Sequence, residues 1–186
     1  YSASLRHGVT ELPFKLNYVG NFSAINCGLT NLSTTPETCR ICWIGGNPLT
    51  SLEGGPELVK QQFSVGSCNL TSLEHGPSMP PSGFYGCEHN QLTDLRGCPQ
   101  ELSVLRAHGN PLTSLEGLPH ACQDISLTWT PDLPLLRLVL VHGLRKLHFD
   151  LERASPSEVL DSIMERHIGQ GKPALSACAL RTICAA

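Results

Sequence analysis

The chain has 186 residues, a length that suits one medium domain or a repeat array with a small appendage. Its 13 basic and 16 acidic side chains leave a net charge of −3, which excludes a general electrostatic attraction to nucleic acid or anionic lipid. No run of 18 apolar residues occurs, so no transmembrane helix is predicted.

One phrase returns along the chain at nearly constant intervals. The motif NPLTSLEGGPE begins at Asn47 and NPLTSLEGLPH begins at Asn110. Related motifs begin at Cys68 and Asn90. Aligned on the apolar residue before Thr, the repeats follow one another every 20 to 22 residues. The aligned positions are Val9, Leu29, Leu49, Leu70, Leu92, Leu112 and Leu133. A period of this length is typical of a solenoid, in which each repeat buries its apolar face against its neighbours.

Each repeat is predicted to contain a short strand that ends at Asn or Cys. Five and seven residues before the aligned position stand mostly apolar side chains, and this alternation indicates a strand with those residues facing the core. The pairs are Phe22 and Ala24, Cys42 and Ile44, Phe63 and Val65, Tyr85 and Cys87, and Leu105 and Ala107. The Asn side chain is expected to bond backbone groups where the strand ends, and Cys to do so more weakly.

The pattern resembles the leucine-rich repeat family, L-x-x-L-x-L-x-x-N/C-x-L, at the short end of its length range. The fullest match runs through Leu102, Leu105, Ala107, Asn110, Leu112 and Leu115. The LTSLEG-x-P wording is similar to short repeats of phage and bacterial proteins, and to the repeat domains of bacterial effector ubiquitin ligases. The resemblance implies an α/β solenoid with short parallel strands on its concave face, and assigns residues 1–133 to an array of about six repeats.

Residues 134–186 are predicted to form a capping segment with two helices, because the open end of a solenoid exposes core and strand edge. PLLRLVLVHGL, from Pro134, fits a helix that ends near Gly143 or a last buried strand, and RKLHFD fits a short strand. A capping box at Ser155–Glu158 begins one predicted helix, and residues 173–183 form the other.

Five of the nine cysteines, Cys27, Cys39, Cys42, Cys68 and Cys87, are interpreted as reduced residues of the repeat frame, whereas the reactivity of Cys98, Cys122, Cys178 and Cys184 is left open. Cys39-x-x-Cys42 has the spacing of a metal or redox pair, but both positions face the core of the repeat, where Cys packs as a small apolar side chain. Cys27 and Cys68 share a position two repeats apart, beyond disulfide reach. We therefore expect no metal, no cofactor and a reducing intracellular compartment. The Tyr1–Ser2 start is similar to some matured mitochondrial N-termini, which makes the mitochondrial matrix one alternative.

The outward strand positions are predicted to bind a partner. A solvated face would carry small polar or charged residues, whereas several of these positions are apolar or aromatic with charged neighbours, as in protein contacts. The predicted partner-binding residues are Ile41, Trp43, Ser64, Phe84, Glu88, Val104, Arg106 and His108. A covering segment from this same chain is an alternative occupant of the face.

No phosphate loop, nucleophile elbow or other enzyme signature occurs, and no small-molecule substrate is expected. The predicted function is a non-catalytic protein–protein interaction module, a scaffold or accessory subunit of a large intracellular complex. One alternative is the substrate-recognition part of an effector-type ubiquitin ligase. Another is a ribonucleoprotein subunit that contacts RNA through a basic cluster, Arg137, Arg145, Lys146 and Arg153.

Overall fold

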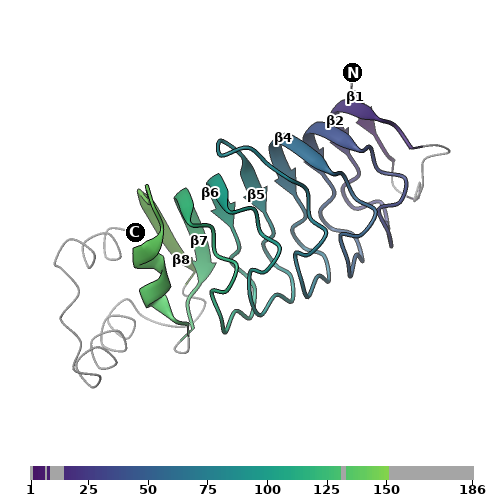
Figure 1. Ribbon diagram of the computed structural model, residues 1–186. Helices are drawn as coiled ribbons and strands as arrows, with labels where there is room; N and C mark the ends of the chain where they lie inside the picture. The colour runs from purple at the N-terminus through teal and green to yellow at the C-terminus, as the bar shows by residue number, and fades with distance from the viewer. Residues whose placement is uncertain (1, 7, 9–14, 131–132, 151–186) are drawn as a thin grey trace, which may run out of the picture.

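The computed structural model describes residues 2–6, 8, 15–130 and 133–150. Over these residues the chain winds into a solenoid with one parallel sheet along its length (Figure 1). Each strand pairs in parallel with the next strand along the chain, so the sheet order is the sequence order. The eight strands are β1 (Ser2–Ser4), β2 (Tyr18–Ser23), β3 (Thr38–Trp43), β4 (Leu58–Ser64), β5 (Phe84–Gly86), β6 (Glu101–Arg106), β7 (Ala121–Thr128) and β8 (Lys146–Asp150).

The solenoid expectation is confirmed, but its α/β form is wrong for the described residues. The segments that return from one strand to the next are turns and extended chain, and the one helix described is a 3₁₀ helix, η1 (Leu135–Leu140). The return segments are short and carry Gly and Pro in phrases such as EGGP, which oppose a regular α-helix.

The segment after residue 133 also differs from the expected cap. PLLRLVLVHGL contains η1 rather than an α-helix or a strand, whereas RKLHFD forms the predicted strand, β8, which pairs with β7 in the same sheet. The two predicted cap helices, in residues 155–186, lie outside the described residues.

The predicted inward positions form the core. The aligned leucines of five repeats and the paired strand residues are all buried, and the repeats therefore share one continuous cluster. Two of the largest of these side chains, Phe63 and Tyr85, lie on neighbouring strands with ring centroids 5.1 Å apart. Their stacking gains from both apolar burial and the tilted ring contact.

The described cysteines belong to this core. Cys39 and Cys42 are both fully buried, which confirms that they pack inward. A hydrogen bond that the Cys42 thiol donates to Cys39, together with burial, raises the pKa of Cys42 well above its ordinary value, and the same bond lowers the pKa of Cys39. All seven described cysteines are buried free thiols. Burial raises the pKa of four of them, Cys68, Cys87, Cys98 and Cys122, and so favours the neutral thiol, which is the less reactive form.

In three repeats a buried asparagine at the strand end ties the repeat to the one before it. The Asn47 Oδ1 accepts hydrogen bonds from three consecutive backbone N–H groups of residues 27–29, at 2.9–3.0 Å. Its Nδ2 donates to the carbonyls of Ala24 and Ile44, both at 2.7 Å. Asn90 and Asn110 repeat this arrangement. The buried amide thus satisfies backbone groups that the strands leave unpaired.

Among the described repeats, those of Asn47 and Asn110 are each followed by a repeat that has no asparagine at the strand end. In these two repeats the backbone after the asparagine forms a tight turn. Leu49 and Leu112 donate their N–H groups to the carbonyls of Asn47 and Asn110, two residues back, at 2.8 Å in each case. Proline stands at the centre of both three-residue turns, as Pro48 and Pro111. The fixed φ of proline suits such a turn, and the turn supplies the acceptor that the next repeat lacks. The corresponding positions in those next repeats are Cys68 and Thr130.

Candidate functional site

The side chains that point away from the core form rows across the sheet, and we call this surface the outer face. The register aligns a first row of Asn21, Ile41, Gln62, Phe84, Val104, Asp124 and Lys146. A second row holds Ser23, Trp43, Ser64, Gly86, Arg106, Ser126 and His148. Backbone hydrogen bonds continue the ladder to a third row of Ile25, Gly45, Gly66, Glu88 and His108.

The structure brings all eight predicted partner-binding residues onto the outer face. Each of them is partly buried rather than fully exposed, because neighbours on adjacent strands cover its flanks. Other large apolar side chains of the described residues are more exposed: Tyr18, Ile25, Leu58 and Leu140, at 51%, 49%, 36% and 73%. The predicted residues therefore form a packed surface rather than a set of projecting side chains.

The outer face of β2 to β4 combines aromatic and basic side chains. Arg40 donates from Nη2 to Asn21 Oδ1 at 2.7 Å and from Nη1 to Gln61 Oε1 at 3.2 Å. The Lys60 ammonium lies 5.5 Å from the ring centroid of Tyr18, within cation–π range. Both basic groups thus have neutral partners in this part of the face.

An ion pair joins the strands at the other end of the face. Arg106 Nη1 and Nη2 donate to the two carboxylate oxygens of Asp124, at 2.8 and 2.9 Å. These hydrogen bonds lower the pKa of Asp124, and the carboxylate raises the pKa of Arg106 in return. His148 Nε2 lies 3.6 Å from the same carboxylate, so one acid links β6, β7 and β8. The charge of Arg106 is matched inside the chain.

A histidine pair borders this cluster. His108 Nδ1 lies 3.1 Å from the Ser126 hydroxyl, and its ring meets that of His89 edge to face at a centroid distance of 5.2 Å. His89 has a positive φ of 53°, and its ring covers Gly109 of the following repeat. The glycine leaves the space that the ring occupies.

Sequence reasoning missed Asp124, Ser126 and His148 as members of the face. The predicted strand pairs stop at Leu105 and Ala107, although Cys122, Ile125 and Leu127 keep the inward spacing of the earlier strands and are all buried. That spacing is the signal that predicts Asp124 and Ser126 as outward residues. His148 required the register of β8, which follows a 3₁₀ helix rather than the repeated phrase.

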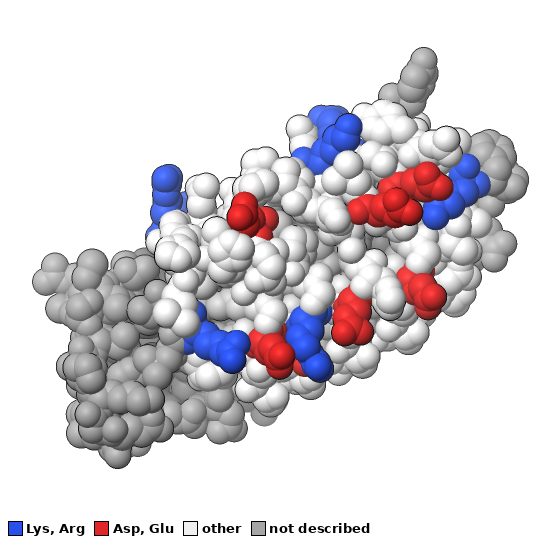
Figure 2. Space-filling model, viewed as in Figure 1, with Lys and Arg blue, Asp and Glu red and all other residues white. Residues whose placement is uncertain are grey.

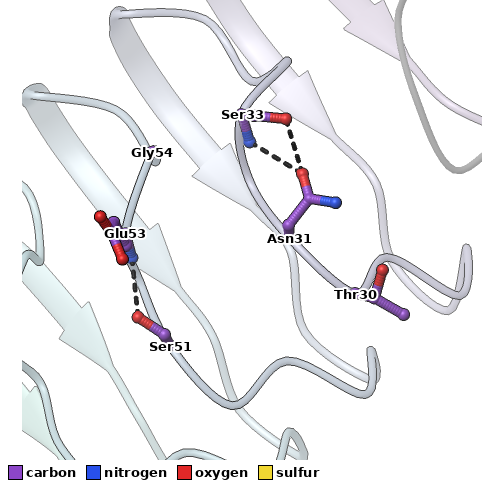
Figure 3. Close-up of a pocket in the computed structure, with 6 residues that line it drawn as sticks. All are labelled: Thr30, Asn31, Ser33, Ser51, Glu53 and Gly54. Atoms are coloured by element: carbon purple, nitrogen blue, oxygen red, sulfur yellow. Dashed lines mark hydrogen bonds between the residues drawn. The ribbon is translucent and has the colours of Figure 1, made fainter.

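A second candidate is a hollow of about 410 Å³ between two return segments (Figure 3). Asn31 Oδ1 accepts from the N–H and hydroxyl of Ser33, at 3.1 and 2.7 Å, and Ser51 Oγ accepts from the N–H of Glu53 at 3.1 Å. The side chains of Asn31 and Ser51 thus form hydrogen bonds within their own turns. Thr30 and Gly54 complete the lining of the hollow. The hollow is exposed and holds one charged side chain, so it lacks the converging polar groups of a ligand site.

Charge is sparse elsewhere on the solenoid. On the side seen in Figure 2, charged side chains follow the two long borders, and a broad uncharged band lies between them.

Within the described part of the chain, no group of three or more His, Cys, Asp or Glu residues could hold a metal ion. In that same part, no helix has the length and apolar character needed to cross a membrane.

Comparison with protein-family models, with curated proteins and with solved structures finds no match to this chain.

Proposed function

We propose that this chain is a non-catalytic interaction module of the leucine-rich repeat type that binds another protein through its outer face. The observation that carries the proposal is the placement of Ile41, Trp43, Phe84 and Val104 on one face, in adjacent rows of the same sheet. Aromatic and apolar residues in the middle of a polar face are typical of the contact residues of protein interfaces.

Partial burial supports binding by these residues. Trp43 and Phe84 are held between neighbours on a regular sheet, so they lose little side-chain entropy when a partner covers them. Flanking charge is already balanced where Arg106 meets Asp124, which reduces the cost of desolvating that part of the face. A rigid surface of this kind suits a scaffold or an accessory subunit of a larger intracellular assembly.

The repeat type and the compartment rest on separate observations. The consensus positions, the buried asparagines at the strand ends and the parallel sheet agree with a leucine-rich repeat. The buried free cysteines agree with a reducing compartment.

A pull-down with the full chain tests the proposal. We expect the Trp43→Ala, Phe84→Ala double variant to recover its partner at least about tenfold less than wild type, because interface aromatics dominate binding energy. Leu140→Ala is the matched control, since Leu140 is a more exposed apolar residue in η1, outside the outer face. Equal recovery by the double variant and the control would count against the outer face as the binding surface.

A further inference from the structure

Glu88 occupies a special place on the outer face, because its side chain folds back over two glycines. A Cβ on Gly66 would stand 2.5 Å from the Glu88 Oε1, and a Cβ on Gly86 would stand 2.9 Å from its Oε2. Gly66 lies beside Glu88 in the third row, and Gly86 lies two residues before it. The two glycines therefore make the room that the carboxylate fills.

This carboxylate has no partner for one of its oxygens. Among the described residues, Glu88 Oε2 is buried and accepts no hydrogen bond. The guanidinium of Arg106, on the neighbouring strand, is engaged by both oxygens of Asp124. Arg106 therefore acts on Glu88 only as a nearby charge, without a hydrogen bond, and a desolvated carboxylate oxygen is costly unless a donor reaches the group.

Aromatic and uncharged groups surround the carboxylate. Phe84 Cε1 and Ser64 Oγ lie 3.1 and 3.5 Å from the point where a Cβ on Gly86 would stand, the same point that Glu88 Oε2 approaches. Trp43 neighbours Ser64 in the second row. In the third row Gly45 neighbours Gly66, which is buried beneath the Glu88 side chain.

We propose that Glu88 receives a lysine or arginine side chain of the protein partner. The cationic head pairs with the Glu88 carboxylate from the side of Oε1, and the aliphatic stem lies over the apolar side chains of the neighbouring rows, Trp43 and Phe84 among them. An aromatic border favours a cation, and long basic side chains bury their stems on apolar surface. This inference rests on the proposed function and adds the chemistry of the partner: a basic residue with apolar neighbours. A divalent metal ion fits less well, because a single carboxylate supplies few of its oxygen ligands.

Two capped peptides test the inference on the full chain, with Ac-Leu-Arg-Leu-NH₂ and its neutral counterpart Ac-Leu-Gln-Leu-NH₂ as probes. Titrations followed by ¹H–¹⁵N NMR report on the amides of Gly66 and Gly86 and on the Trp43 indole. We expect the arginine peptide to shift these signals with an affinity about tenfold higher than the glutamine peptide, since a hydrogen bond to a charged group contributes that much. In Glu88→Gln the two peptides are expected to bind equally, whereas the exposed control Glu57→Gln keeps the preference.

Equal affinities in wild type, a preference that survives in Glu88→Gln, or the absence of shifts at these signals with either peptide would each overturn the inference. None of these results contradicts the proposed function, which the pull-down with Trp43 and Phe84 variants decides separately. Circular dichroism of Glu88→Gln confirms that the variant is folded before its peptide binding is compared.

Discussion

Arg106 and Asp124 form a two-pronged ion pair across the outer face, with the guanidinium nitrogens 2.8 and 2.9 Å from the carboxylate oxygens. The two residues lie two positions out of register on strands β6 and β7, and their side chains are 27% and 17% exposed. The parallel geometry of the hydrogen bonds fixes both side chains. This contact stiffens the end of the face that lies next to the apolar residues.

The pair predicts a pH dependence of stability. Because the folded protein lowers the pKa of Asp124, the pair stabilises the fold above the unfolded pKa of about 4, and this contribution is lost as pH falls through the lower folded value. Solvent screens the partly exposed pair, so Asp124→Asn is expected to cost only about 0.5–1 kcal/mol at pH 7. Urea unfolding of the wild type and of Asp124→Asn at pH 7 and pH 3 measures this cost. The difference between their free energies of unfolding is expected to be smaller at pH 3. A cost that grows in acid would contradict the assignment.

The buried asparagines predict large losses on truncation. Asn110→Ala removes the acceptor of the Asn90 and Leu92 N–H groups and the donor to the carbonyls of Cys87 and Ala107. We expect the free energy of unfolding to fall by about 2–4 kcal/mol, measured by chemical denaturation. The exposed Asn69 is the control, and Asn69→Ala should change stability by less than about 0.5 kcal/mol. Similar effects at the two positions would show that the Asn110 network is not in place.

The proline turn and the missing asparagine are expected to be coupled. In the wild type, Leu49 donates to the Asn47 carbonyl around Pro48; with Cys68→Asn, a side-chain oxygen competes for the same N–H group. Cys68→Asn should therefore stabilise the fold more in a Pro48→Gly background than in the wild-type background. The two changes together reproduce the arrangement in which Asn47 Oδ1 accepts from the N–H groups of Gly28 and Leu29. A double-mutant cycle is expected to show a favourable coupling of about 0.5–1.5 kcal/mol. Additive effects would mean that the turn and the asparagine are independent.

Close stacking of the return segments is tested by two glycines with similar backbone angles. Gly97 has φ +89° and Gly143 has φ +75°, so alanine strains both by about 1–2 kcal/mol. A Cβ on Gly97 would also meet the backbone of Leu73 and Glu74 in the preceding repeat, whereas one on Gly143 would meet nothing within 4 Å. Thermal or urea unfolding should show Gly97→Ala to be destabilised by roughly 1–3 kcal/mol more than Gly143→Ala. Equal losses would contradict the close packing of these turns.

Much of the strand layout could be predicted because the repeat keeps inward and outward residues in phase. Cys42, Phe63 and Leu105 were predicted to be inward from spacing alone, and all three are buried. The α/β form implied by the resemblance was wrong for the described residues, because the short Gly- and Pro-containing return segments lack the length for a helix.

The outer face was predictable as a set of residues but less so as a set of contacts. The eight predicted residues lie on one face because strand alternation dictates direction. Which groups pair there depends on residues one repeat away. The ion pair of Arg106 with Asp124 and the position of the Glu88 side chain over Gly66 both depend on the cross-strand register. Spacing within a repeat does not reveal that register.

Site-specific photo-crosslinking tests the central claim, that the outer face binds a protein partner, most directly. A benzophenone side chain placed at Gln62 stands in the first row between Ile41 and Phe84, and the same group at the exposed Glu74 stands on a return segment. We predict that illumination in cell extract links a defined partner through position 62, that the link disappears in the Trp43→Ala, Phe84→Ala background, and that position 74 does not form it. Linkage of the same partner from position 74 but not from position 62 would contradict the account.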